Sequence, residues 1–176
     1  MSLLIHATPI GLWHEVVKDA ENKCEVQLHA ELEAYLVTLL ARYINQPKLV
    51  KEIFATAFLK AIKQQERERQ LALQQIGDGC LLFTGLFPKI VERRRVKIRY
   101  FVDLGRTAYS GISQTTDDLY HLLSLQFVVL MDVLQSIPYD GCLLPLDAYE
   151  QWNELGSQRA LKILKTYTHA FPMRKY

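Results

Sequence analysis

Apolar residues recur at steps of three and four along much of this chain, which is the spacing of a helix with one buried face. The first clear example extends from about Cys24 to Ile44, where Leu28, Leu32 and Leu36 would share one face. A second amphipathic helix is expected after Pro47, because a proline in the first turn of a helix has no N–H that needs a partner. Both segments therefore predict helices that pack on a common core.

The segment Leu73–Phe87 continues the helical spacing, although it includes three glycines. Each internal glycine costs about 1 kcal/mol relative to alanine. The glycines therefore indicate close approach of a neighbouring helix or, at Gly77–Gly79, a local break. Pro88 is expected to end this helix. The charged stretch before it, Lys63–Gln70, holds no Gly or Pro and is compatible with either a helical extension or a loop.

Three further helices are expected in the C-terminal part of the chain. Thr116 is a good N-cap for a strong helix over Leu119–Leu134. After a loop, two short helices are predicted over Leu146–Glu154 and, capped by Ser157, over Gln158–Tyr167.

Residues 92–111 can be interpreted at two periodicities. Apolar and charged residues alternate over Val96–Val102, which is typical of a strand. The helical pattern spans more residues, because Ile98, Tyr109 and Ile112 lie in one sector at 100° per residue. A lone strand would also have no partner for its backbone hydrogen bonds. We therefore predict a helix.

This helix has apolar side chains on two sides. Val96, Tyr100 and Leu104 point away from the main apolar face. A helix with two apolar sides is usually central in a bundle or covered by a second subunit. These three residues are therefore a candidate interface.

Together these patterns predict one all-α domain over residues 1–176, a helical bundle of about five to seven helices. The segments Leu73–Phe87, Ile98–Ile112 and Leu119–Leu134 should form its centre. A chain of 176 residues is large enough to bury about 70% of the surface that it exposes when unfolded. Its 49% hydrophobic and 23% charged residues exclude a disordered chain.

The N-terminal sequence is a poor signal peptide, because it has no basic start and His6, Pro9 and Gly11 interrupt its apolar residues. No apolar run approaches the roughly 18 residues that a membrane span needs. Cys24, Cys80 and the third cysteine, Cys142, are widely spaced, which favours reduced thiols over disulfides or a zinc site. We expect a cytoplasmic protein with no membrane association.

The net charge of +2 is too small to indicate nucleic-acid binding, so any such role needs a local basic patch. One candidate is the cluster of Arg93, Arg94, Arg95, Lys97 and Arg99. A solvated charged turn is the favoured interpretation, since charge runs are commonly exposed. Binding of an anion or a nucleic acid is the alternative.

No catalytic or metal-binding motif is complete in this sequence. The chain has no nucleophile elbow, no Cys–His signature and no phosphate-binding loop. Asp118 and His121 have the (i, i+3) spacing found in di-iron bundles, but such a site needs a second element of this kind and further carboxylates. We therefore assign no catalytic residue, no metal site and no cofactor.

A set of polar and aromatic residues on the predicted helix of residues 98–112 is a possible ligand site. Tyr100, Asp103, Arg106 and Tyr109 could line a pocket. A structural ladder, with tyrosine hydroxyls at the edge of the core, is the other interpretation and the favoured one.

Three stretches in the middle of the chain, GDGCLLFTGLFP, YFVDLGRTAYSG and LLSLQFVVLMDVLQ, resemble an uncharacterised family of small bacterial all-helical proteins with no assigned activity. The resemblance covers about the middle third of the chain and includes no catalytic motif. It implies an all-helical fold and carries no information about function.

The leading functional prediction is a non-enzymatic protein that acts through protein contacts, as a homodimer or with a protein partner. It rests on the two-sided helix and the missing catalytic motifs. An alternative from another class is a small-molecule or lipid-binding helical protein, or an enzyme, with an apolar pocket near Tyr100, Tyr109 and the Gly-rich segment. Anion or nucleic-acid binding through Arg93–Arg95 is the weakest alternative.

Overall fold

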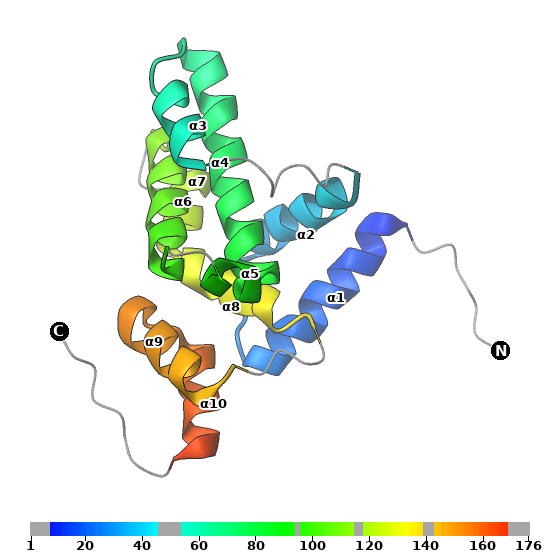
Figure 1. Ribbon diagram of the computed structural model, residues 1–176. Coiled ribbons are helices and arrows are strands. Elements are labelled where there is room, and N and C mark those ends of the chain that lie inside the picture. The colour runs from blue at the N-terminus through cyan, green and yellow to red at the C-terminus, as the bar shows by residue number, and fades with distance from the viewer. Residues whose placement is uncertain (1–7, 46–53, 94–95, 115–117, 139–142, 169–176) are drawn as a thin grey trace.

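The computed structural model describes residues 8–45, 54–93, 96–114, 118–138 and 143–168. All regular secondary structure in these ranges is helical, which confirms the all-α class (Figure 1). The number of helices in these ranges exceeds the predicted five to seven. They are α1 (Pro9–Cys24), α2 (Ala30–Asn45), α3 (Phe54–Ala61), α4 (Glu66–Leu86), α5 (Pro88–Arg93), α6 (Ile98–Ile112), α7 (Leu119–Leu125), α8 (Phe127–Gln135), α9 (Pro145–Leu155) and α10 (Gln158–Tyr167).

Helix α4 lies at the centre and packs most extensively against α6, with α8 and α3 also against it (Figure 1). The predicted central segments are therefore confirmed. The close approach of α4 and α6 depends on a glycine in each helix. A Cβ at Gly77 would lie 2.6 Å from the ring of Tyr109, and a Cβ at Gly105 would lie 2.6 Å from Phe127 and 2.9 Å from Cys80. Helix α4 continues without a break through Gly77–Gly79.

The N-terminal half differs from the sequence-based prediction in two places. Helix α1 lies in a segment for which no helix was predicted. In the structure Pro9 occupies the first turn, and the Thr8 hydroxyl accepts a hydrogen bond from the Gly11 N–H at 3.1 Å. The predicted helix from Cys24 corresponds to α2, which begins later because Glu25 ends α1 in a left-handed conformation (φ 54°).

Three other boundaries were decided by the structure. The stretch Lys63–Gln70 begins in a turn after α3 and continues as the first turn of α4. Pro88 follows the end of α4, as predicted, and also begins α5. The predicted helix Leu119–Leu134 is two helices, α7 and α8, because Gln126 adopts a non-helical backbone conformation (φ −96°, ψ 13°). Thr116 and the part of the second predicted helix that precedes Phe54 lie outside the described residues.

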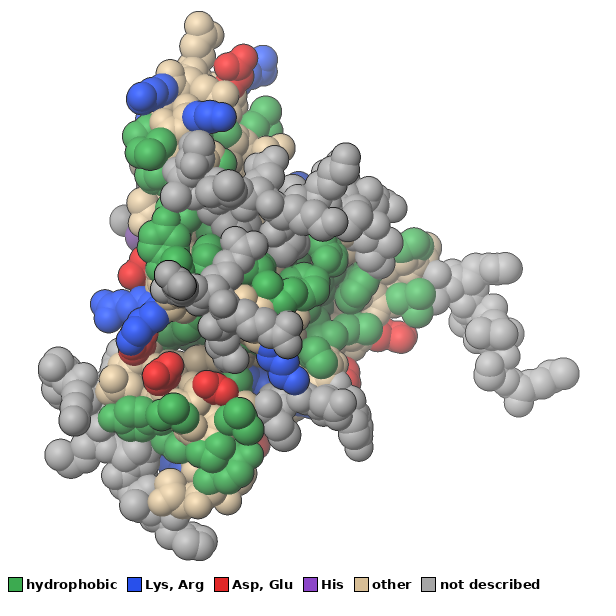
Figure 2. Space-filling model, viewed as in Figure 1, with side chains coloured by type: hydrophobic (Ala, Val, Ile, Leu, Met, Phe, Trp, Pro, Cys, Tyr) green, Lys and Arg blue, Asp and Glu red, His purple; other side chains and the backbone are tan. Residues whose placement is uncertain are grey.

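The buried apolar residues form two separate clusters. The larger cluster joins helices α1 to α8. The smaller belongs to the α9–α10 hairpin and consists of Leu143, Ala148, Trp152, Ala160 and Leu164. The two predicted C-terminal helices are confirmed, and the Ser157 hydroxyl caps α10 by accepting from the Ala160 N–H at 3.0 Å. In Figure 1 this hairpin stands apart from the central helices, and Figure 2 shows apolar side chains on its surface beside acidic ones.

None of the helices in the described ranges combines the length and the apolar character that a transmembrane helix requires.

Candidate functional site

A carboxylate is buried in the main core. Asp78, in the middle of α4, is only 1% exposed. Its Oδ1 accepts hydrogen bonds from the hydroxyls of Tyr35 (2.5 Å) and Tyr109 (2.7 Å), and its Oδ2 accepts one from Nη2 of Arg42 (2.5 Å). The donors belong to α2 and α6, so Asp78 connects three helices through side-chain hydrogen bonds. We call these four residues the Asp78 network.

The electrostatics of the network follow from its burial. Burial raises the pKa of Asp78, while the hydrogen bonds from Tyr35, Tyr109 and Arg42 oppose that rise. The two O–H···O distances fall in the range of hydrogen bonds to an ionised carboxylate. Burial, and next the charge of Asp78, raise the pKa of Tyr35 and of Tyr109 well above the usual range for a phenol. Both tyrosines are therefore neutral donors at physiological pH.

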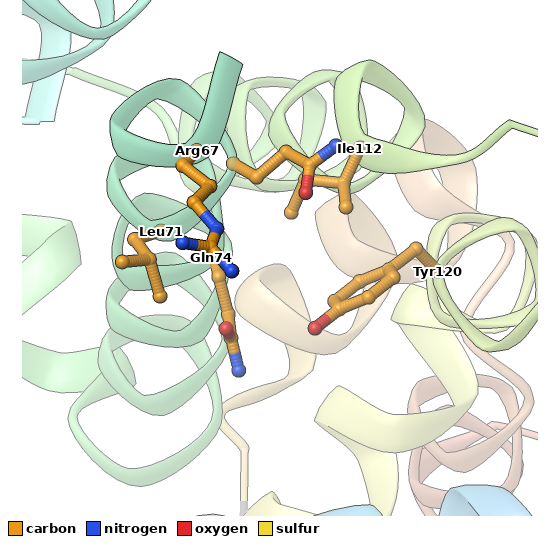
Figure 3. Close-up of a pocket in the computed structure, with 6 residues that line it drawn as sticks. Arg67, Leu71, Gln74, Ile112 and Tyr120 are labelled. Atoms are coloured by element: carbon orange, nitrogen blue, oxygen red, sulfur yellow. The ribbon is translucent and has the colours of Figure 1, made fainter. Parts of the chain in front are cut away.

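An open cavity of about 470 Å³ lies beside this network, between α4, α6 and α7. Figure 3 shows Arg67, Gln74 and Tyr120 directed into the same opening, with Leu71 on the α4 side. The cavity is lined by Arg67, Gln70, Leu71, Gln74, Ile112 and Tyr120.

Two residues that line the cavity contact tyrosines of the Asp78 network. Gln74 Nε2 donates a hydrogen bond to the Tyr35 hydroxyl at 3.3 Å. The ring of Tyr120 packs against Tyr35 and Tyr109, with ring centroids 6.4 Å and 6.2 Å apart. Two lining residues are therefore held by side chains that Asp78 positions. We call the cavity together with the Asp78 network the candidate site.

The site offers hydrogen-bonding side chains next to apolar surface, which is the usual composition of a small-molecule pocket. The described ranges contain no group of three or more His, Cys, Asp or Glu residues that could hold a metal ion. Asp118 and His121, whose spacing resembled a metal element, are explained by helix capping. The Asp118 side chain accepts a hydrogen bond from the backbone N–H of His121 at 2.8 Å and caps α7.

The four residues of the predicted pocket do not come together. Tyr109 is fully buried in the Asp78 network, whereas Tyr100 is exposed, because their spacing places them on opposite sides of α6. Asp103 is also exposed and pairs with Arg99 (3.6 Å). Arg106 is half-buried, and its backbone carbonyl accepts a hydrogen bond from a serine of α7. Of the four, only Tyr109 belongs to the candidate site.

The residues of the predicted interface lie at one end of α6. Val96 and Tyr100 are exposed, and Leu104 is half-buried. Val96 precedes the helix, whose N-cap is Lys97. The Tyr100 ring packs edge-on against Phe101, with centroids 5.3 Å apart. The coverage of Val96 and Tyr100 by a second chain stays a prediction.

Part of the predicted anion-binding cluster lies outside the described residues, namely Arg94, Arg95 and the side chain of Arg93. The other two cations have carboxylate partners within the chain. Lys97 Nζ lies 2.8 Å from Glu154 of α9, and Arg99 pairs with an aspartate one turn along α6. These two pairs make Lys97 and Arg99 less available to an external anion.

A second carboxylate, Asp132 of α8, is buried where the C-terminal hairpin meets the main bundle. It is 3% exposed and accepts a hydrogen bond from the Ser157 hydroxyl at 2.6 Å. The backbone N–H of Arg159 also approaches it, at 3.5 Å. Arg159 extends the connection by donating to Gln135 at 2.9 Å. Burial raises the pKa of Asp132 to about 6.

Cys24 and Cys80 are free thiols and are both buried, and Cys142 lies outside the described residues. The Asp78 network was not found from the sequence. One signal was present, because Asp78 is the one charged residue in the stretch from Leu71 to Phe87. Its partners Tyr35 and Arg42 carried no such signal, since both fit the polar edge of an amphipathic helix.

Comparison with models of known protein families, with curated proteins and with solved structures gave no match. The resemblance to a family of small bacterial helical proteins therefore stays a prediction.

Proposed function

We propose that this protein binds a small organic molecule in the cavity between α4, α6 and α7. The observation that carries the proposal is the contact between the cavity and the buried Asp78 network. Gln74 and Tyr120 line the cavity, and both touch tyrosines that Asp78 holds. A surface hollow formed by chance would not need such support.

The cost of burying Asp78 supports the same proposal. An ionised carboxylate in a core is costly unless it is paired, and an apolar side chain of similar volume would often be at least as stable. Binding sites depend on such groups because a second layer of hydrogen bonds fixes the side chains that touch the ligand. Asp78 fixes the hydroxyl of Tyr35, which in turn orients Gln74 at the cavity wall.

The proposal is tested by titrating the protein with N-phenylnaphthylamine, an uncharged fluorophore that brightens in apolar surroundings. Leu71 lines the cavity and is 62% exposed, so Leu71→Trp should narrow the cavity without disturbing the core. We expect the affinity for the fluorophore to fall by about tenfold or more, since loss of about 1.4 kcal/mol of contact energy corresponds to that factor.

The matched control is Leu59→Trp. Leu59 is 59% exposed on α3 and does not line the cavity, so both variants add the same indole at similar exposure. Equal affinity in the wild type and in both variants would contradict the proposal, because the fluorophore would then bind elsewhere.

A second candidate function, contact with another protein chain, is favoured by exposed apolar residues around the start of α6. Ile90 of α5 is exposed, as are Val96 and Tyr100. A homodimer through this surface predicts that Tyr100→Glu converts a dimer to a monomer in light scattering. A wild-type monomer at high concentration would exclude the homodimer.

A further inference from the structure

Some of the polar side chains that line the cavity already form hydrogen bonds within the chain, and others do not. Gln70 Nε2 donates to Glu66 at 3.1 Å, and Gln74 Nε2 donates to Tyr35. Arg67 and the Tyr120 hydroxyl, in contrast, have no hydrogen-bond or ion-pair partner among the described residues. The two groups left for a ligand are therefore a guanidinium and a phenol.

Arg67 is unusual among the basic residues near the site. Arg42 is paired with Asp78, and Arg69 on the same helix lies 3.7 Å from Glu66. Arg67 has no such carboxylate in the described part of the chain, yet Figure 3 shows its guanidinium directed into the cavity. The lining residues that the structure describes include no Asp or Glu, and the nearby carboxylate of Glu66 accepts a hydrogen bond from Gln70.

The place of Arg67 along α4 supports the same conclusion. Arg67 lies in the first turn of the helix, which begins at Glu66. The helix dipole disfavours a cation at this end and favours an anion. An Arg67 without a carboxylate partner is therefore in an unfavourable position, which a bound anion would relieve by neutralising its charge. Apolar surface for the rest of such a molecule is present in Leu71 and Ile112.

We infer that the ligand of this cavity is an amphipathic organic anion, with a carboxylate bound by Arg67 and an apolar body against Leu71 and Ile112. The inference rests on the proposed function and adds the chemical class of the ligand. Tyr120 donates a hydrogen bond to the bound molecule, since burial raises the pKa of its hydroxyl and keeps it protonated. Arginine suits this role because its planar fork can hold both oxygens of a carboxylate.

The test compares naphthylacetate with naphthylacetamide, which have the same aromatic body and differ in charge. Their dissociation constants are measured by ligand-observed NMR on the full-length wild type, Arg67→Gln and Arg69→Gln. We expect the wild type to bind the acid about fivefold more tightly than the amide, which is the factor for an ion pair worth about 1 kcal/mol at a partly exposed site. Arg67→Gln should remove this preference, and Arg69→Gln should retain it.

Arg67 is exposed, so its substitution should leave the fold intact, and thermal unfolding checks this. If acid and amide bind equally, and Leu71→Trp weakens both, the binding function stands and the anionic class is wrong. An equal loss of preference in Arg67→Gln and Arg69→Gln would also overturn the inference, because it indicates general electrostatic attraction. If neither probe nor N-phenylnaphthylamine binds, both the inference and the proposed function fail.

Discussion

Asp78 and Asp132 are both buried carboxylates, but they have different surroundings. Asp78 lies among packed helices of the main core and accepts hydrogen bonds from two tyrosines and an arginine. Asp132 lies at a junction between two apolar clusters, and its closest donor is the hydroxyl of Ser157 at the start of α10. One carboxylate reinforces contacts that apolar packing already makes. The other holds the C-terminal hairpin to the bundle.

Burial raises the pKa of both carboxylates, and different donors oppose that rise at each of them. For Asp78, a guanidinium and two phenols stabilise the charged form against the cost of burial. For Asp132 the opposing groups are the Ser157 hydroxyl and Arg159, and burial raises its pKa to about 6. Asp132 therefore changes charge close to physiological pH. The attachment of α9 and α10 should accordingly depend on pH, in a way that Asp132→Asn can isolate.

The largest effect is expected from Asp78→Ala. The substitution leaves the buried hydroxyls of Tyr35 and Tyr109 and the Arg42 guanidinium without their acceptor, which should reduce the free energy of unfolding by about 3 to 5 kcal/mol. Urea unfolding followed by circular dichroism measures this. A loss below about 1 kcal/mol would mean that the network contributes little and that the contrast with Asp132 is incorrect.

The next effect is the pH dependence due to Asp132. Its folded-state pKa of about 6 lies above the ordinary value of 3.8, so the folded state binds the proton more tightly than the unfolded state does. The stabilising contribution is complete below about pH 4 and is lost as the pH rises through about 6, in total up to about 3 kcal/mol.

This prediction is checked by urea unfolding of the wild type and Asp132→Asn. Asparagine resembles the protonated acid and does not titrate. Between about pH 5 and about pH 7.5 the wild type should lose about 1.4 kcal/mol relative to the variant. A constant difference between the two proteins over this range would contradict the raised pKa of Asp132.

A smaller effect is expected from Gly77→Ala, which acts on the Asp78 network through packing. The added methyl group would overlap the ring of Tyr109, which is fully buried and cannot move away easily. Overpacking of this kind costs about 1 to 3 kcal/mol, which exceeds the gain of about 1 kcal/mol in helix propensity. Gly111→Ala is the control, because its Cβ would meet only the flexible end of Leu73. The control should be neutral or stabilising.

The smallest effect is expected from Ser157→Ala, at about 1 kcal/mol. The substitution removes the cap of α10 and the hydroxyl that donates to Asp132. Its cost should be larger at about pH 7.5 than at about pH 5, because the hydroxyl stabilises the ionised carboxylate. Thr8→Ala removes a cap without a nearby acid, on α1, and its cost should not change with pH. Equal pH dependence in the two variants would remove Ser157 from the explanation.

Local pattern was sufficient for several elements of the fold. The signals of the last two helices, which are apolar spacing and, for α10, the Ser157 cap, lie within a few residues of each other, and both helices form where expected. For Gly77 the sequence left close approach and a local break as alternatives. The structure shows close approach, to Tyr109, a partner that could not be identified from the sequence. The division at Gln126 was missed because the apolar spacing continues across it.

Most of the candidate site could not be predicted from the local sequence pattern. Its hydrogen bonds join Asp78 to residues far away in the sequence, in α2 and α6. Polar residues on an amphipathic helix look the same whether they face water or a buried carboxylate. The candidate pocket on α6, which was the less favoured interpretation, grouped residues by composition, whereas Tyr100 and Tyr109 lie on opposite sides of that helix.

By itself, the sequence determined the all-α class, the central helices and the Ser157 cap of α10. These follow from periodicity and capping, which act over one or two turns of chain. Only the tertiary structure decided that Asp78 is surrounded by donors, that Asp132 joins two apolar clusters, and that Arg67 faces a cavity. The physical reason is that the burial and pairing of a side chain depend on which helices pack together. The same polar side chain is compatible with many different packing arrangements.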